Sequence, residues 1–341
     1  MADQQSIKRG VSLYSYQEEY CYGKMSLEDC LSVTNNMGIE GIEIVSDQMI
    51  HGNPFPQEGF YENWRGWIAK YHLTPVCNDI FINTNLYKNR NLTLKESIQA
   101  LTAEIKHTCN LGCHKMRLVS NTPVGVVESC LSCAEDNDVV MALEVHAGLG
   151  FGNPYTRKFI DVMLDRKSPY LGLVPDMGLF CRKFPRVVKY YYVRRRANPR
   201  LADYMVEAYD AGDTAVFSNF SGKIPGRLMK FNPGPDDMEF IFMMGAFENN
   251  DVTLLKEFIP HTVNVHAKFY EMTEGCVEYS IPYDEIIAFF GREGYTGYLC
   301  SEYEGNRFIH DAFEVDSVEQ VRRHQVMMKR YIDGKERSVN V

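Results

Sequence analysis

Acidic and imidazole side chains recur late in the sequence, in four short segments that each follow an apolar run. Glu144 and His146 stand in Leu-Glu-Val-His, Asp176 in Pro-Asp-Met-Gly, His266 in Val-His-Ala-Lys and Glu302 in Ser-Glu-Tyr-Glu. Three carboxylates and one histidine suit a moderately hard divalent ion that keeps open or water-filled positions. We therefore expect Glu144, Asp176, His266 and Glu302 to bind Mn2+, with Mg2+, Co2+ or Fe2+ as alternatives. Any one of these residues, taken alone, is equally well explained as a solvated loop residue.

Further polar residues share strand faces with this set. Alternation along a strand places Lys268 on the face of His266, and Glu304 on the face of Glu302. Glu304 therefore competes with Glu302 for the place of the fourth ligand, and Lys268 is a candidate for substrate contact. Residues near the ends of earlier strands are weaker candidates for facing the cavity, because a packed aromatic ring or a core ion pair explains them as well: Tyr14, Tyr16, Glu43, His51, Asn78, Asp79 and Arg117.

Apolar runs alternate with helical patterns along the whole chain. The expected strands cover residues 10–16, 41–47, 74–81, 114–121, 139–147, 171–178, 261–270 and 298–303. Helices are expected between them, with Ser26 and Pro123 at helix starts and Gly112 where a helix ends. Eight such units predict one (β/α)8 TIM-barrel domain over residues 1–341, with its chemistry at the C-terminal strand ends. A doubly wound open sheet is less favoured, because no Gly-rich phosphate loop follows the first strand.

One connection breaks this rhythm. Roughly 80 residues separate the sixth and seventh strands, where a loop, a helix and a loop would need about 30. Residues 236–258 are expected to form the barrel helix, which leaves residues 182–235 as an insertion. We interpret the insertion as a lid, a substrate wall or a partner-docking surface on the active-site side of the barrel. It is rich in aromatic and basic residues, although a solvated helix face explains the basic ones equally well: Tyr190, Tyr191, Tyr192, Arg194, Arg195 and Arg196.

Composition excludes several classes of function. The chain has 341 residues and a formal net charge of −9, which argues against nucleic acid as the main partner. No stretch approaches the roughly 20 apolar residues of a membrane span, and the polar start lacks the apolar segment of a signal peptide. A cytoplasmic protein is the simplest expectation. The ten cysteines are scattered, and Cys130 and Cys133 have no second pair to complete a zinc site, so reduced thiols are expected.

The four late segments together resemble the xylose-isomerase-like TIM-barrel superfamily, whose sugar isomerases and epimerases bind one metal through Glu, Asp, His and Glu from the last four strands. Three further segments resemble a narrower group, the catalytic α subunits of bacterial C-glycoside deglycosidases. They are Ser-Leu-Tyr-Ser-Tyr-Gln-Glu-Glu-Tyr at 12–20, Gly-Lys-Met-Ser-Leu-Glu-Asp at 23–29 and Ser-Glu-Tyr-Glu-Gly at 301–305. The spacing from Asp176 to His266 departs from the superfamily pattern because of the insertion.

The narrower resemblance implies a lyase that acts on 3-oxo-C-glycosides, such as an oxidised flavonoid glycoside. The enzyme removes the proton on C2 of the sugar, and the enolate then expels the aromatic aglycone by β-elimination. His146 is the expected base, because it shares a strand face with Glu144. A role in orienting Glu144 is the alternative. The resemblance also implies a smaller β subunit as partner in a hetero-oligomer.

Other functions remain open on the residues alone. A sugar isomerase or epimerase would use the same metal to stabilise a cis-enediolate, and the insertion favours the lyase over it. A non-catalytic subunit would be expected to have lost ligands, whereas all four are present. A DNA-repair endonuclease of the same superfamily would need further metal ligands and a basic face, and the acidic charge balance disfavours it.

Overall fold

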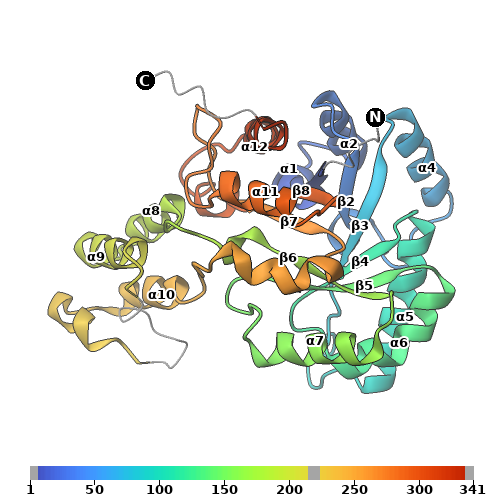
Figure 1. Cartoon of the computed structure of the whole chain (residues 1–341), viewed down its shortest axis with the longest axis horizontal. Coiled ribbons are helices and arrows are strands. Elements are labelled where there is room, and N and C mark those ends of the chain that lie inside the picture. Colours follow the sequence, from blue (N-terminus) through green and yellow to red (C-terminus); the bar gives the residue numbers. More distant parts are fainter. Residues whose placement is uncertain (1–6, 214–222, 335–341) are drawn as a thin grey trace. The chain divides into compact units, whose positions relative to one another are not determined.

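A computed structural model describes residues 7–213 and 223–334 of the chain (Figure 1). By its internal contacts the chain forms two compact units. Unit 1 comprises Met1–Asp176, Glu257–Ala267 and Tyr295–Glu302, and unit 2 comprises Met177–Lys256, Lys268–Gly294 and Tyr303–Val341. Each unit is described separately below.

Among the described residues, eight strands form one sheet in the order β6-β5-β4-β3-β2-β1-β8-β7. Pairing is parallel from β6 through to β8. Parallel bridges between Leu173 and Thr262 and between Asp176 and His266 join the free edge of β6 to the β7 segment, which nearly closes the sheet into a barrel. The predicted (β/α)8 fold is therefore confirmed. The strands are β1 Lys8–Ser12, β2 Gly41–Val45, β3 Thr74–Ile80, β4 Lys115–Leu118, β5 Val140–Val145, β6 Leu171–Pro175, β7 Val265–Phe269 and β8 Tyr298–Tyr303.

The helices of unit 1 begin at residues that satisfy their first backbone N–H groups. Ser26 Oγ accepts from the backbone N–H of Asp29 at 3.1 Å, and the Asp29 carboxylate accepts from the backbone N–H of Ser26 at 2.8 Å. Thr93 and Glu96 form the same reciprocal pair before α5. Serine and threonine favour helix N-termini, so these two helix starts can be predicted from the sequence. The helices are η1 Leu13–Tyr16, α1 Gln17–Cys21, α2 Leu27–Asn36, α3 Ser46–Met49, α4 Phe60–Lys70, α5 Leu94–Asn110, α6 Val124–Asp136 and α7 Pro154–Arg166.

In the described part of residues 182–235, unit 2 contains the helices α8 and α9 and the short helix η4. Asp237, in the first turn of α10, accepts from the backbone N–H of Asn198 before α9 at 2.6 Å and from that of Gly234 at 2.8 Å. One carboxylate therefore connects the starts of α9 and α10. The helices of this unit are η2 Met177–Leu179, α8 Arg186–Arg194, α9 Pro199–Asp210, η4 Gly226–Phe231, α10 Pro235–Met244, α11 Tyr283–Arg292, η6 Asn306–Phe308 and α12 Ser317–Ile332, and η5 Val252–His261 crosses from unit 2 into unit 1.

Two sequence-based boundaries differ from the structure. The first strand ends at Ser12 and continues as η1, not as a strand to residue 16. The helix expected over residues 236–258 is also wrong in extent, because α10 ends at Met244 and η5 starts only at Val252. Asparagine and aspartate residues in the intervening segment favour turns, and the Asp251 carboxylate accepts from the backbone N–H of Thr253 at 2.8 Å.

All ten cysteines are free thiols, as expected from their scattered positions. Cys77 and Cys300 are fully buried and pack together with Val76 and the partly buried Tyr298. No helix in the described part of the chain is long and apolar enough to cross a membrane.

Candidate active site and metal centre

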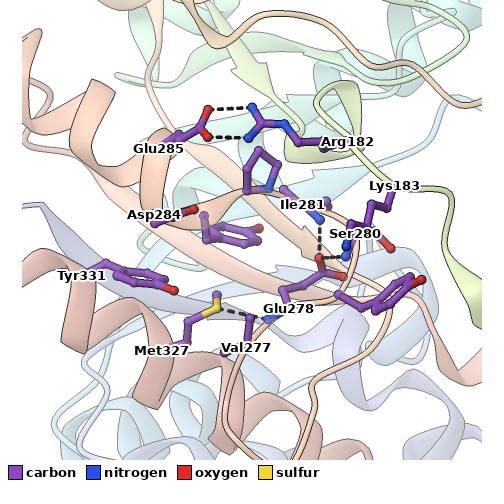
Figure 2. Close-up of a pocket in the computed structure, with 13 residues that line it drawn as sticks. Arg182, Lys183, Val277, Glu278, Ser280, Ile281, Asp284, Glu285, Met327 and Tyr331 are labelled. Carbon is purple, nitrogen blue, oxygen red and sulfur yellow. Dashed lines mark hydrogen bonds and ion pairs between the residues drawn. The ribbon is translucent and has the colours of Figure 1, made fainter. Parts of the chain in front are cut away.

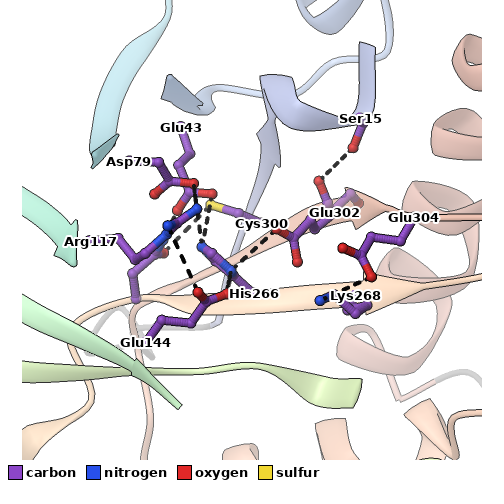
Figure 3. Close-up of polar contacts among 12 residues, drawn as sticks. Ser15, Glu43, Asp79, Arg117, Glu144, His266, Lys268, Cys300, Glu302 and Glu304 are labelled. Carbon is purple, nitrogen blue, oxygen red and sulfur yellow. Dashed lines mark hydrogen bonds and ion pairs between the residues drawn. The ribbon is translucent and has the colours of Figure 1, made fainter. Parts of the chain in front are cut away.

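Unit 1 contains a buried cluster made of the four residues expected to bind metal. Figure 3 labels three of them, Glu144, His266 and Glu302. Glu144, Asp176, His266 and Glu302 each offer a ligand atom, and these atoms all lie within 4.8 Å of one another. His266 Nδ1 is 2.9 Å from Glu144 Oε1 and 3.4 Å from Glu302 Oε1. The structure therefore brings together one imidazole and three carboxylates from four consecutive barrel segments.

Strand register places these side chains side by side. Asp176 and His266 form a parallel bridge, and Glu144 of β5 lies opposite Val174 of β6. Ser15 in η1 donates through its hydroxyl to the carbonyl of Ser301 at 3.0 Å, which ties η1 to β8 next to Glu302. The site thus sits at the carboxyl ends of parallel strands, where barrel active sites are found.

A second polar group faces the opposite side of the His266 ring. His266 Nε2 lies 3.1 Å from Glu43 Oε1 and 3.8 Å from Asp79 Oδ2. Arg117 donates to Asp79 Oδ2 at 2.9 Å, and its other terminal nitrogen is 3.8 Å from Glu144 Oε2. Glu43, Asp79 and Arg117 were only weak candidates from the sequence, yet all three point into the same buried region. Their positions on β2, β3 and β4, strands that pair with one another, are the signal that links them.

Negative charge exceeds positive charge in this region. Five carboxylates are buried here, together with one guanidinium and one imidazole: Glu43, Asp79, Glu144, Asp176, Glu302, Arg117 and His266. Burial alone would raise the pKa of Glu144, but Arg117 and His266 hold it well below its usual range. Burial would likewise lower the pKa of His266, but the carboxylates, Glu302 and Glu43 foremost, raise it well above its usual range. A buried excess of carboxylates is costly without a compensating cation, so the donor set fits a bound divalent ion.

His146 follows β5 and is partly exposed. Its Nδ1 lies 2.6 Å from the carbonyl oxygen of Ala147. Because a carbonyl only accepts, Nδ1 must carry the proton in this contact, and Nε2 of the neutral ring is left with its lone pair. His146 follows Glu144 by two residues along the chain, just after the end of β5. This geometry suits both a general base and a group that orients Glu144.

The contacts of Glu302 and Glu304 distinguish the two glutamates as candidates for the fourth metal ligand. Glu302 supplies the third carboxylate of the cluster and so its fourth ligand. Glu304 belongs to unit 2, where its carboxylate lies 3.3 Å from Lys268 Nζ and 3.3 Å from Arg307. Lys268 and Glu304 are therefore an ion pair within unit 2 (Figure 3).

The remaining candidates lie outside the cluster. The side-chain amide of Asn78 donates to Thr108 Oγ1 on α5 at 2.9 Å, because alternation turns Asn78 outward and Asp79 inward. Tyr16 is fully buried, and burial raises its pKa well above the usual range. His51 is exposed in the turns after α3, and Tyr14 is half-buried in η1.

Unit 2 has a pocket of its own (Figure 2). At its rim the Arg182 guanidinium and the Glu285 carboxylate form an ion pair. In its wall the buried Glu278 carboxylate accepts from the backbone N–H groups of Ser280 and Ile281, and burial raises its pKa to about 7. These groups are engaged with the surrounding loop, which indicates a structural role for them.

No family model matches the chain, but several curated proteins are similar to it. The 3'-dehydrocarminate deglycosidase alpha subunit of Microbacterium sp is 25% identical over 87% of this chain and 88% of that protein. A C-glycoside deglycosidase alpha subunit of Arthrobacter globiformis is 24% identical over 96% of this chain and 93% of that protein. Another, from Microbacterium trichothecenolyticum, is 26% identical over 92% and 88%.

Solved structures show the same fold. D-psicose 3-epimerase of Clostridium cellulolyticum, solved with D-tagatose, has a TM-score of 0.58 at 12% identity and covers 96% of this chain and 99% of its own. The IOLI protein, solved with a zinc atom, has a TM-score of 0.58 at 11% identity, covering 97% and 99%. The chain thus has the TIM-barrel fold of these solved structures. Its expected resemblance to the α subunits of C-glycoside deglycosidases is confirmed at 24% identity over 96% of its length.

Proposed function

We propose that this protein is a metal-dependent carbon–carbon lyase that detaches an aromatic aglycone from the sugar of a 3-oxo-C-glycoside. One observation carries the proposal: the buried cluster of Glu144, Asp176, His266 and Glu302, with His146 beside it, occurs in a chain whose relatives are named C-glycoside deglycosidases. One of those names includes a 3'-dehydro sugar derivative as the compound acted on.

The first step is the removal of a proton from C2 of the sugar. The neighbouring 3-oxo group makes this proton acidic, because the resulting carbanion is delocalised onto the 3-oxo oxygen. His146 Nε2 takes the proton, since its Nδ1 is engaged with the carbonyl of Ala147. A positioned general base of this kind contributes about 10²–10⁴-fold to the rate.

The second step expels the aglycone. The enolate electrons form a double bond between C1 and C2 as the 3-oxo group is restored, and the bond between C1 and the aromatic carbon breaks. That carbon leaves with the bonding electron pair and takes up a proton. The two steps together need no oxidant or reductant, because the sugar enters already oxidised at C3.

The four clustered side chains would hold the divalent ion, which is most consistent with Mn2+. When bound, such an ion acts as a Lewis acid and lowers the cost of negative charge that develops on the 3-oxo oxygen. The protein's own contribution is to bury the ligands, to fix Glu144 through Arg117, and to keep His146 next to them.

We also propose that the insertion over residues 182–235, of which 214–222 lie outside the described residues, contributes to a surface for a smaller partner subunit. The relatives are named alpha subunits, and Tyr190 of α8 is 49% exposed. Exposed tyrosine and arginine are typical of protein interfaces. Arg194 is less available, because it donates to the Phe308 carbonyl and to Asp311, both at 2.7 Å, within unit 2.

The test is a direct assay of the purified protein, alone and with its co-purifying small subunit. Incubation with a 3-oxo-C-glucoside should release the free aglycone, detected by chromatography, and EDTA should abolish the release until Mn2+ is restored. Interconversion of free ketoses without any aglycone release would identify an isomerase or epimerase instead. Release that is unaffected by a chelator would refute the metal dependence.

A further inference from the structure

The carboxylates near His266 Nε2 are held in place by hydrogen bonds from other side chains. Asp79 Oδ2 already accepts from Arg117 at 2.9 Å, and the second oxygen of Glu43 accepts from the side-chain amide of Asn264. Cys300 Sγ in turn lies 3.5 Å from Asn264 Oδ1. The Glu43 carboxylate is fully buried, so its position is fixed by these contacts and by its strand.

We infer that Glu43 is a positioning residue: it accepts the Nε2 proton of His266 and so presents the Nδ1 lone pair to the metal site. This inference rests on the metal site of the proposed function. It assigns a role to a residue on β2, on a different strand from the four clustered ligands.

The chemistry of imidazole supports this assignment. A neutral histidine donates from one ring nitrogen and offers a lone pair on the other. Nε2 lies 3.1 Å from Glu43 Oε1, within donor–acceptor distance, and among the described residues neither of these buried atoms has another hydrogen-bond partner. An ionised carboxylate can only accept. Nδ1 lies 2.9 Å from Glu144. A lone pair at Nδ1 would face carboxylate oxygens unfavourably unless a cation lies between them, so metal binding and the proton on Nε2 are mutually consistent.

The same distances could suggest a second ion between Glu43, Asp79 and His266, because these three also meet metal-ligand spacing. That alternative is disfavoured by the donors already present. The Arg117 guanidinium already lies 2.9 Å from Asp79 Oδ2, so a second cation there would lie beside a fixed positive charge. The pattern is that of partners that orient a metal-binding histidine.

The first measurement is zinc affinity, because zinc binding requires no substrate and no turnover. Apoprotein is titrated with Zn2+ against a competing chelating dye for wild type, Glu43→Gln and Glu104→Gln. Loss of an orienting partner typically weakens metal affinity by about 10–100-fold, and this is expected for Glu43→Gln. Glu104→Gln is the matched control, because Glu104 is also a buried glutamate of unit 1, on α5, and accepts from Asn53 at 2.9 Å.

The second measurement is the tautomer of His266, which needs no Glu43 variant to fold. Protein labelled with 15N at histidine and loaded with Zn2+ is examined by long-range 1H–15N correlation, with His266→Asn identifying the signal. A protonated Nε2 and a zinc-shifted Nδ1 are expected. A protonated Nδ1 would overturn the inference.

Equal zinc affinity in wild type and Glu43→Gln would also overturn it, as would a second zinc equivalent that only Glu43→Gln loses. Wild-type protein that binds no zinc would refute both the inference and the metal site. A protein that binds zinc as expected but releases no aglycone would leave Glu43 in its role and refute the lyase alone.

Discussion

The two sides of the His266 ring differ in how their carboxylates are compensated. On the Nε2 side, Asp79 is paired with Arg117 and Glu43 with Asn264. On the Nδ1 side, three carboxylates cluster around the ring, and the nearest guanidinium contact is the 3.8 Å separation between Arg117 and Glu144. Both sides are buried and both are acidic. On the Nε2 side one oxygen of each carboxylate accepts from Arg117 or Asn264, whereas on the Nδ1 side four ligand atoms meet the spacing of a metal site.

This difference separates a structural side from a functional side within one buried group. Buried charges are normally paired or bind metals. The Nε2 side is stabilised by the chain itself, whereas the Nδ1 side is suited to a cation from outside. Changes on the Nδ1 side should therefore act mainly on metal binding and activity, whereas changes on the Nε2 side should lower stability or weaken metal binding indirectly through His266.

The largest effect is expected from Asp176→Asn on the Nδ1 side. Loss of an anionic ligand should empty the metal site, and loss of Lewis-acid stabilisation of several kcal/mol corresponds to an activity decrease of about 10³-fold or more. Aglycone release at saturating Mn2+ measures this effect. Retention of wild-type activity would remove Asp176 from the site.

His146→Asn tests the base beside the Nδ1 side. Its turnover should fall by about 10²–10⁴-fold, because no group is left to take the C2 proton. Its metal content should stay at the wild-type level, measured on the same preparation. If metal and turnover are lost together, His146 acts by supporting Glu144.

Arg117→Met tests the Nε2 side. Removal of one partner from a buried ion pair costs about 3–5 kcal/mol, because Asp79 would be left uncompensated. Urea denaturation should show this loss of stability. Arg117→Lys keeps the charge without the planar guanidinium and should be less severe. An unchanged midpoint for Arg117→Met would mean that the Nε2 side does not depend on its guanidinium.

The smallest effect is expected from Asn78→Ala, next to Asp79 but facing outward. It removes a buried hydrogen bond to Thr108 and should cost about 1–3 kcal/mol. The rate of aglycone release per folded molecule should be unchanged. The amount of folded protein used for this ratio is measured by a method that does not depend on the active site. A selective loss of turnover would show that Asn78 contacts substrate after all.

Sequence patterns predicted the barrel and the four clustered residues because strand alternation and strand ends are local signals. Glu302 and Glu304 share a strand face, so alternation alone could not distinguish them; the contacts of Lys268 and Arg307 with Glu304 did. The pairing of Glu43 with His266 spans distant strands and depends on barrel closure. Asn78 was expected to face the cavity, but it points outward and donates to Thr108 on α5. Which residues of β3 point outward depends on packing against α5, which the sequence of the strand does not show.

The break between α10 and η5 was missed for a related reason. Apolar residues continue on both sides of residues 245–251, and the turn there depends on side-chain contacts such as that of Asp251 with Thr253. Periodicity reports which residues are buried, but it does not report where the backbone changes direction.

The metal content of the protein tests the contrast between the two sides of His266 most directly. Wild type and Asp176→Asn are equilibrated with Mn2+, freed of unbound ion, and analysed by mass spectrometry for metal per chain. One ion per wild-type chain and none in Asp176→Asn are expected. No ion in wild type, or equal amounts in both proteins, would contradict a divalent metal on the Nδ1 side of His266.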